Sequence, residues 1–513
     1  MRKGAKARRP SLTLQSHKEY HRSIVSADHG PSTGNTQPLD SIFHPTSVAV
    51  AGAAEGRIGQ SFLNCLLDSS FEGPVYPVNP RGGEICGLKS YRHLAEVPGA
   101  VDYVISCIPS NLASQLIEDC ADKGVKAVAF FTAGFSEMDD PDARQLEVDL
   151  ISRARERGVR VLGPNCLGVY NPGIELSFSS DFPCEQGSVG LLCQSGGNAI
   201  YFIRAAAQRG IRFSKAVSYG NAADIDESEL LQYFAADPDT GMVAAYIEGV
   251  KDGGRFLEAC HKLAAVKPLV VLKGGATGAG VKAASSHTGA LAGSDKVWDT
   301  VFRQVNAIRV NYLEEMVDAL VALTYLPDLK GRRVAVCGAG GGFSVIAADD
   351  YARAGFDLVV LPAQVRQAMS QHIAQFVKSE AGFLMGNPVD ITNVITFDSH
   401  YGVLKILAGF EDVDLLVGHF SVNNSEWPNT GSGFGVWIDT LTQALGKVHA
   451  ETAKPSALLI HSVLTPFDME RAVALGQQAS QAGLAVFHSS AKAALALERV
   501  LAYRERAASI GAR

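Results

Sequence analysis

Residues 47–59 read SVAVAGAAEGRIG, a short apolar run that ends at Gly52 and leads into a segment with helical apolar spacing at 58–68. A similar succession of a Val/Ile/Ala-rich run, a Gly or Pro turn and a longer amphipathic segment recurs from Leu39 onward. Parallel sheets covered by helices produce this pattern, because their strands are buried on both faces. We therefore predict an α/β protein made of doubly wound domains.

The predicted strands fall into three blocks. They lie at 47–52, 75–79, 101–108, 127–131 and 159–162; at 188–193, 243–247, 268–272 and 307–310; and at 333–337, 413–418, 456–460 and 484–487. A polar segment at 171–187 and a short linker at 328–333 separate the blocks. We predict domains at 39–170, 186–327 and 333–505.

Composition narrows the class of protein. The 513 residues suffice for about three domains at about 100–200 residues each. With 47% hydrophobic and 19% charged residues, and no uninterrupted apolar run of about 18 residues, we expect a soluble globular protein without membrane spans. A net charge of −7 provides no overall footprint for nucleic acid. Nine scattered cysteines without a C-x-x-C pair favour a reducing, cytoplasmic location over a disulfide framework or a zinc site.

The first 38 residues differ from the rest. They carry seven Lys or Arg against Glu19 and Asp28 and have no apolar core of a secretory signal. We predict a disordered basic arm at 1–38, with a transit peptide or a polyanion-binding tail as the alternatives.

The first turn is a candidate anion site. Gly52, Gly56 and Gly59 stand where a strand feeds a helix, and amides at a helix start attract phosphate. The spacing is not G-x-G-x-x-G, and the second strand ends at Asn79 without a carboxylate for a ribose diol, which argues against a nicotinamide cofactor.

Cations and further loops surround this turn in the predicted fold. Arg57, Arg81 and Lys89 suit a ligand with several phosphates, although a packing turn with surface cations is an equal alternative. Three other strands end in the loops CIPSN (107–111), TAGFSE (132–137) and GPNCLG (163–168). Ligands of open α/β sheets bind beyond the carboxyl ends of the strands, so the loops together favour one binding crevice.

Similar glycine turns open the second and third blocks. Ser195, Gly196 and Gly197 follow the strand at 188–193, and Gly340, Gly341 and Gly342 follow the strand at 333–337. Each turn exposes amide donors at a helix start and is a candidate phosphate cradle. An ordinary N-cap and a close-packed turn are the respective alternatives.

A long connection in the second block holds a single imidazole. Residues 273–293 are almost wholly Gly, Ala, Ser and Thr around His287, and long connections without periodicity are usually functional or disordered. A neutral imidazole can accept a phosphoryl group if a carboxylate holds its other nitrogen. Glu248 ends the strand at 243–247, at the predicted sheet edge where this connection begins. A capping role for Glu248 is the alternative.

Several strings, read in order, carry a resemblance. They are LDSIFHPTSVAVAGA (39–53), VYPVNP (75–80), TAGFSE (132–137), GPNCLG (163–168), SSHTGALAGSD (285–295) and GNPVDI (386–391). The chain resembles the nucleoside-diphosphate-forming acyl-CoA synthetases, the superfamily of succinyl-CoA synthetase and ADP-forming acetate–CoA ligase. The match runs from residue 39 to about residue 500.

The resemblance implies a Rossmann-like CoA-binding domain followed by two flavodoxin-like domains of the succinyl-CoA synthetase type. It implies that CoA is bound by Gly52, Arg57, Gly59, Asn79, Lys89, Ile108, Pro109, Gly134, Phe135 and Asn165. It also implies that His287 is phosphorylated during turnover, that Glu248 supports it, and that the two cradles hold the phosphoryl group. No metal site is expected on this chain.

The implied reaction is acyl-CoA + phosphate + NDP ⇌ carboxylic acid + CoA + NTP, through an acyl phosphate and a phosphohistidine. The three blocks leave no room for the nucleotide-binding ATP-grasp region that single-chain members carry. We therefore expect an alpha-subunit-like chain in a hetero-oligomer, with Mg-ADP or Mg-ATP bound by an ATP-grasp beta chain. The acid and the choice between ADP and GDP stay open.

Two other functions are compatible with the sequence. One is a non-catalytic regulator that binds CoA or acyl-CoA, and the other is a phosphate-dependent acyl or carbamoyl transferase that charges no nucleotide. An intact His287 with both cradles argues against a mere binder, and the absence of an ATP-grasp partner would favour the transferase.

Overall fold

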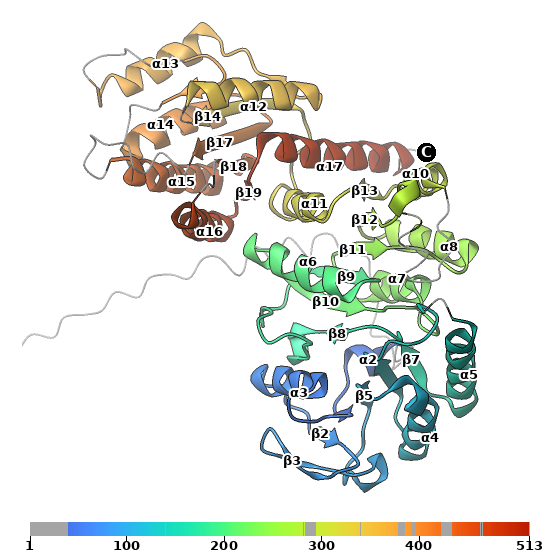
Figure 1. The fold of residues 1–513 in the computed structure, drawn as a ribbon. Helices are drawn as coiled ribbons and strands as arrows, with labels where there is room; N and C mark the ends of the chain where they lie inside the picture. The colour runs from blue at the N-terminus through green and yellow to red at the C-terminus, as the bar shows by residue number, and fades with distance from the viewer. Residues whose placement is uncertain are drawn as a thin grey trace, which may run out of the picture. The chain divides into compact units, whose positions relative to one another are not determined.

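The computed structural model describes residues 39–513 except 139, 281, 283–293, 339, 378–384, 392–395, 422–432, 462, 464 and 512–513. The predicted basic arm and His287 thus lie outside the described residues. The α/β class is confirmed, because the strands form three largely parallel sheets with helices packed on them (Figure 1).

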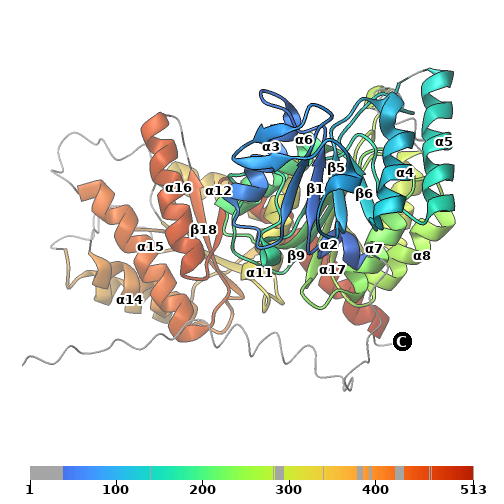
Figure 2. The same cartoon turned by 90° about the horizontal axis from the view of Figure 1, so that it is seen from below.

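The first sheet has five parallel strands in the order β2-β1-β5-β6-β7. Its strands are β1 (Val48–Ala51), β2 (Val75–Val78), β5 (Tyr103–Ser106), β6 (Ala127–Phe130) and β7 (Arg160–Leu162). Its helices are α3 (Ile58–Asp68), α4 (Ala113–Lys123) and α5 (Pro141–Arg157). Helices α4 and α5 pack together on one face, and α3 covers the other (Figure 2). The strand order reverses between β1 and β5, where such sheets bind ligands.

A small antiparallel hairpin follows β2. It consists of β3 (Gly83–Ile85) and β4 (Leu88–Ser90). A bridge between Val78 and Tyr91 attaches the hairpin to the end of β2. The hairpin therefore stands beside the carboxyl edge of the first sheet.

The second sheet has the order β13-β12-β11-β9-β10-β8. Its strands are β8 (Gly168–Tyr170), β9 (Val189–Cys193), β10 (Phe213–Ser218), β11 (Met242–Ile247), β12 (Leu269–Lys273) and β13 (Ile308–Val310). Helices α6 (Gly196–Gln208), α7 (Glu227–Ala236), α8 (Gly253–Ala264), α10 (Asp295–Gln304) and α11 (Leu313–Tyr325) connect them. Strand β8 is antiparallel to β10 although it follows the first sheet directly in sequence.

The third sheet has the order β15-β14-β17-β18-β19, with β16 also paired to β14. Its strands are β14 (Arg333–Gly338), β15 (Asp357–Leu358), β16 (Val389–Asp390), β17 (Leu415–Ser421), β18 (Ser456–His461) and β19 (Ala485–Phe487). Its helices are α12 (Gly341–Arg353), α13 (Ala363–Ile373), α14 (Phe397–Ala408), α15 (Gly433–Thr452), α16 (Pro466–Gln481) and α17 (Ser490–Gly511). Without the antiparallel strand β8, the second sheet follows the doubly wound strand order of flavodoxin. The third sheet follows the same order when β16 is left aside. Both agree with the predicted architecture.

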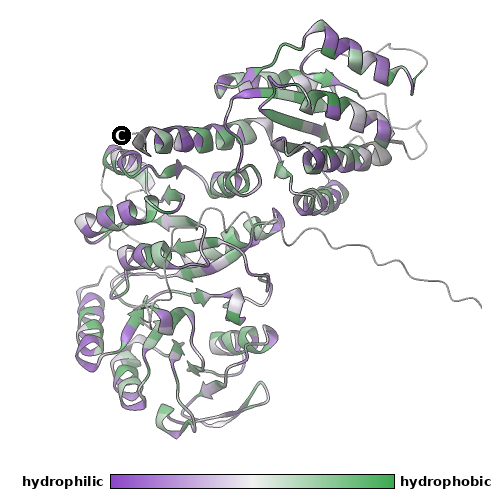
Figure 3. Ribbon diagram, turned by 180° about the vertical axis from the view of Figure 1, so that it is seen from behind, coloured by the Kyte–Doolittle hydropathy of each residue, from purple (hydrophilic) through white to green (hydrophobic). Residues whose placement is uncertain are grey.

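Burial explains why these runs became strands. Strands β1, β5, β6, β9 and β17 are buried at every residue, and hydrophobic residues concentrate in the sheets (Figure 3). Helix α17 packs against both α11 and α12, so it joins the second and third sheets. Within the described residues, no helix is both long enough and apolar enough to cross a bilayer.

The sequence pattern misses β10, and a buried lysine explains why. Lys215 interrupts the apolar run of β10, yet its side chain is fully buried. Its Nζ lies 2.9 Å from Asp237 Oδ1 and 3.0 Å from Asp239 Oδ2. Paired charges allow this burial, so a fully buried strand carries a residue that the pattern assigns to solvent.

Candidate active site

The loops predicted to form a crevice meet at the carboxyl edge of the first sheet. Backbone hydrogen bonds link each loop to a neighbouring strand end or loop. They run from the Gly52 amide to the Val78 carbonyl (2.9 Å), from Cys107 to Ala51 (2.8 Å), from Phe131 to Ser106 (3.0 Å) and from Asn165 to Thr132 (3.1 Å). The five strand ends of this sheet therefore present one continuous edge.

The first glycine turn is closely packed against its surroundings. Gly52 has φ +85°, and a Cβ there would lie 2.9 Å from the carbonyl carbon and oxygen of Cys107. A Cβ on Gly59 would lie 2.9 Å from the Gly52 oxygen and from Ala53 Cα. Both positions require glycine for lack of space, and Gly52 also for its backbone conformation.

The side chains of Asn79 and Arg57 differ in their contacts with this turn. Asn79 Nδ2 donates to the Ala53 oxygen at 2.6 Å, and Asn79 Oδ1 accepts from the Arg81 amide at 3.0 Å. Asn79 thus ties β2 to the turn. Arg57 is the exposed N-cap of α3, and its side chain makes no capping hydrogen bond.

Lys89 lies on the hairpin beside Asn79. The Asn79 amide donates to the Tyr91 oxygen at 2.8 Å, and Lys89 Nζ stands 5.0 Å from the centroid of the Tyr91 ring. Lys89 is exposed. Arg57, Arg81 and Lys89, the three cations singled out in the sequence, are thus all exposed at this end of the first domain.

The other predicted CoA contacts come from the loops after β5 and β6. Thr132 Oγ1 donates to the Ile108 oxygen, which holds the Ile108-Pro109 loop against the next loop. Gly134 has φ +102°, and its amide and that of Phe135 donate to Glu137 Oε1. Phe135 is fully buried, backbone included, and its amide is bonded within the loop, so the structure places this predicted CoA contact in the core of the first domain.

The loop at 163–168 lies against both the first and the second sheet. Asn165 has φ +58°, and a Cβ on Gly220 after β10 would lie 2.2 Å from the Pro164 oxygen. The Leu167 side chain fills the space above Gly196, where a Cβ would lie 2.9 Å from Leu167 Cγ. The candidate CoA edge therefore continues directly to the start of α6.

The Ser195 cradle is the N-terminus of α6. Ser195 Oγ accepts from the Asn198 amide at 3.4 Å, which is the geometry of an N-cap. Gly197 is exposed, and among the described residues nothing lies within 4 Å of where a Cβ on it would be. The first amides of this 13-residue helix have no partner within the helix, apart from the amide that Ser195 caps, and they carry the positive end of the helix dipole.

Glu248 lies beside this cradle, on the adjacent strand. It follows β11 and is 6% exposed. Gln194 Oε1, one residue before the cradle, accepts from the Glu248 amide at 2.7 Å and from the Gly249 amide at 3.3 Å. The structure thus places Ser195, Gly196, Gly197 and Glu248 at one edge of the second sheet.

The connection that holds His287 begins at the same edge. Ile247 and Lys273 are paired in the ladder between β11 and β12. Lys273 Nζ donates to the backbone carbonyl oxygen of Glu248 at 2.7 Å and lies 5.1 Å from the centroid of the Trp298 ring. Burial lowers the pKa of Lys273.

The Gly340 cradle belongs to the third sheet. Gly340 has φ +98° and caps α12, and a Cβ on Gly342 would meet none of the described residues within 4 Å. Ser344 Oγ in the first turn bonds to His419 Nε2 at 3.1 Å. Burial and then His461 lower the pKa of His419 to about 3, so the imidazole below this cradle is neutral.

Three residues at the Glu248 edge were not predicted as site residues: Gln194, Tyr246 and Lys273. Tyr246 OH bonds to Glu248 Oε1 at 3.2 Å. Strand alternation provides a signal for Tyr246, because positions two apart point to the same side. Nothing in the sequence predicts that the Gln194 amide group reaches the next strand.

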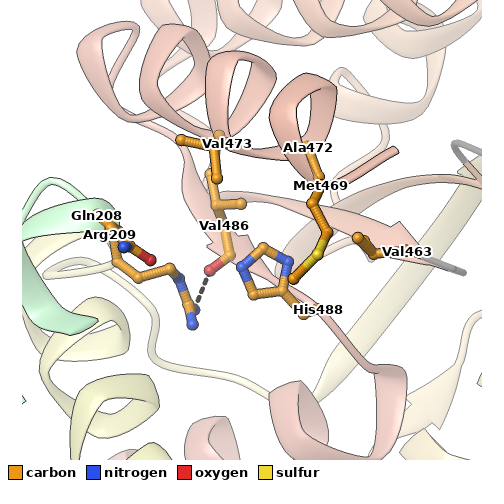
Figure 4. A pocket seen from close by; sticks show the side chains of 9 residues that line it. Gln208, Arg209, Val463, Met469, Ala472, Val473, Val486 and His488 are labelled. Carbon is orange, nitrogen blue, oxygen red and sulfur yellow. Dashed lines mark hydrogen bonds between the residues drawn. The ribbon is translucent and has the colours of Figure 1, made fainter. Parts of the chain in front are cut away.

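One cavity is lined by residues of α6, α16 and β19 and of the loops beside them. It has a volume of about 370 Å³ and contains none of the predicted site residues; it is lined by Gln208, Arg209, Val463, Met469, Ala472, Val473, Gly476, Val486 and His488. Figure 4 shows Arg209 bonded to the Val486 oxygen beside His488. No group of three or more His, Cys, Asp or Glu within the described residues could hold a metal ion.

Two protein families match this chain. The family described as CoA binding domain matches residues 46–172, and the family described as Succinyl-CoA ligase like flavodoxin domain matches residues 186–323. The chain is 36% identical over 374 residues to the alpha subunit of acetate–CoA ligase [ADP-forming] I of Pyrococcus furiosus, which covers 72% of this chain and 79% of the relative.

Two further relatives agree. Acetate–CoA ligase [ADP-forming] of Methanocaldococcus jannaschii is 40% identical over 320 residues, 62% of this chain and 44% of the relative. The solved structure of dinucleotide forming acetyl-coenzyme A synthetase 1 of Ca. Korarchaeum cryptofilum, in complex with phosphate and ADP, has a TM-score of 0.76 at 30% identity and covers 92% of this chain and 98% of that one. The chain therefore belongs to the ADP-forming acyl-CoA synthetase family, as an alpha-subunit-like chain with a CoA-binding domain and succinyl-CoA ligase-like flavodoxin domains.

Proposed function

We propose that this chain catalyses acyl-CoA + phosphate + NDP ⇌ acid + CoA + NTP together with a partner chain, through an acyl phosphate and a phosphohistidine at His287. The observation that carries the proposal is the meeting of the open α6 N-terminus with Glu248 at the edge where the 273–293 connection leaves the sheet. The CoA edge of the first sheet adjoins the same cradle through Leu167.

The first step replaces sulfur by phosphate on the acyl carbon. A phosphate oxygen attacks the thioester carbonyl, the C–S bond breaks, and CoA leaves as a thiolate that takes up a proton. The exposed Arg57 and Lys89 would bind the phosphates of CoA. The amides that begin α6 would hold the attacking phosphate and the acyl phosphate that forms from it.

The second step moves the phosphoryl group to the imidazole. The lone pair of one His287 nitrogen attacks phosphorus, the P–O bond to the acyl group breaks, and the carboxylic acid leaves as its carboxylate. The other ring nitrogen keeps its proton and gains positive charge. The Glu248 carboxylate would accept a hydrogen bond from that nitrogen and stabilise the charge.

We further propose that the partner is an ATP-grasp chain that binds the magnesium nucleotide. The alpha-subunit relative supports a partner subunit, and the described residues already form three complete sheets without an ATP-grasp domain. In the last step the phosphohistidine passes its phosphoryl group to the terminal oxygen of NDP, which regenerates neutral His287.

The experiment uses the full chain in its native complex, incubated with labelled ATP. We expect an acid-labile, base-stable phosphoprotein, which His287→Ala abolishes, while Tyr201→Phe on the exposed face of α6 labels like wild type. Label that persists in His287→Ala would refute the assignment of the nucleophile. A native complex that contains only copies of this chain would refute the partner.

A further inference from the structure

The carboxylate of Glu248 is contacted by a tyrosine from its own strand. Tyr246 and Glu248 are two positions apart at the end of β11, so their side chains lie on the same side. The Tyr246 hydroxyl donates to Glu248 Oε1 at 3.2 Å. Burial and then the Glu248 charge raise the pKa of Tyr246, so the phenol stays protonated and remains a donor at neutral pH.

The backbone of Glu248 is held by other groups. Gln194 Oε1 accepts from the Glu248 amide, and Lys273 Nζ donates to the Glu248 oxygen, both at 2.7 Å. The peptide of Glu248 is therefore fixed on both sides. Fixing the backbone does not fix a glutamate side chain, which keeps three rotatable bonds, and the phenol of Tyr246 restrains the carboxylate itself.

Gly274, which follows the neighbouring strand β12, leaves room for the side chains of Tyr246 and Glu248. A Cβ on Gly274, directly after β12, would lie 2.6 Å from the Tyr246 hydroxyl and 3.3 Å from Glu248 Cγ. Gly275 has φ +74°, whereas Gly274 lies outside the left-handed region, so the backbone conformation of Gly274 does not require glycine. The space that it leaves is occupied by the hydrogen-bonded pair.

We propose that Tyr246 is a positioning residue that orients the Glu248 carboxylate toward the imidazole that accepts the phosphoryl group, in space that Gly274 keeps open. The proposal rests on the proposed function, because it assigns to Tyr246 an effect that acts through Glu248. Hydrogen bonds to charged groups are among the stronger ones in proteins, and this one acts on the group that must meet a developing cation.

A positioning role predicts a selective kinetic effect. Tyr246→Phe keeps the ring and its packing and removes the hydroxyl, which bonds to Glu248 and also takes a hydrogen bond from the Asn198 side chain. Gly274→Ala keeps the hydroxyl and displaces it. Both variants should form phosphohistidine about tenfold more slowly in single turnovers with acetyl-CoA and phosphate. The KM for acetyl-CoA should stay unchanged while kcat falls, because the first sheet is untouched.

Two controls match these variants. Tyr201 on α6 is an exposed tyrosine whose hydroxyl bonds to Glu314 Oε1 at 2.8 Å, so Tyr201→Phe removes a similar tyrosine–glutamate bond that does not involve Glu248. Gly253 is the first residue of α8, and no described residue would lie within 4 Å of a Cβ there, so Gly253→Ala tests a glycine without the close approach. Both controls should react at the wild-type rate, and thermal melts of all four variants in the native complex report on folding.

Glu248→Gln separates the inference from the proposed function. If Glu248→Gln forms phosphohistidine slowly and Tyr246→Phe reacts like Tyr201→Phe, the positioning role is refuted and the proposed function stands. If Glu248→Gln reacts at the wild-type rate, the assignment of Glu248 is wrong and the inference falls with it. A slow Tyr246→Phe with a raised KM and unchanged kcat would also refute the positioning role.

Discussion

Replacing Gly59 by alanine tests whether the first glycine turn is a CoA site. Gly59 is the second residue of α3, and a Cβ there would lie 2.9 Å from the Gly52 oxygen and from Ala53 Cα. Both contacts are to backbone, so no flexible side-chain end can move aside. The turn at 52–53 must shift away from the helix start to accommodate the methyl group.

Two energetic effects oppose each other in this variant. Alanine in a helix is favoured over glycine by about 0.5–1 kcal/mol, but that gain applies equally with and without ligand and does not change affinity. Forcing a methyl group into this space costs about 1–3 kcal/mol. In the free protein the turn can shift and relieve that strain. If CoA requires the turn in place, binding restores the strain, which corresponds to an affinity about 5- to 150-fold weaker.

Isothermal titration of the native complex with CoA measures the effect, with Gly253→Ala as the control. Gly253 also begins a helix, and a Cβ there meets nothing within 4 Å in the part of the chain that the structure describes. We expect weaker CoA binding for Gly59→Ala and wild-type affinity for Gly253→Ala. Unchanged affinity in Gly59→Ala, with a melting temperature that shows the variant is folded, would refute the placement of CoA at this turn.

Three further predictions concern stability. Lys215→Met leaves the buried Asp237 without its cation, so urea unfolding should show a loss of about 3–5 kcal/mol. Burial and then His461 lower the pKa of His419 to about 3, so its stabilising contribution is full above about pH 6.5 and is lost as the pH falls toward 3; thermal melts of His419→Leu should depend less on pH in this window. Burial raises the pKa of Glu227 to about 7, so its contribution is present below about pH 4.3 and lost as the pH rises through 7, and Glu227→Gln should gain melting temperature relative to wild type at about pH 8 but not at about pH 4.

Matched measurements decide these predictions. Lys262→Met removes an exposed lysine paired with Glu258, and it should change stability little. Equal losses in Lys215→Met and Lys262→Met would contradict the role of the buried pair. A pH dependence of melting that His419→Leu leaves unaltered, or a Glu227→Gln effect of equal size at both pH values, would show that these groups do not titrate as their burial requires.

The candidate site could be predicted only in part. The rule that ligands bind beyond the carboxyl ends of parallel strands places the loops of the first sheet at one edge, and the structure joins them there. The same rule places Glu248 with the 273–293 connection, and the pairing of Ile247 with Lys273 brings them side by side. It does not predict that the Phe135 ring is buried in the core while its amide bonds to Glu137.

The α/β class and most strands follow from the order of the residues alone, because apolar runs of strand length followed by amphipathic segments are buried in only one common way. Strand β10 does not, since the charge of Lys215 is compensated by aspartates that are distant in the pattern and close only in the fold. Only the folded chain shows which side chains surround Glu248: Gln194 reaches it from a neighbouring strand, Tyr246 from the same strand and Lys273 from the other neighbour. Contacts between strands depend on register and strand order, and a linear pattern of apolar residues specifies neither.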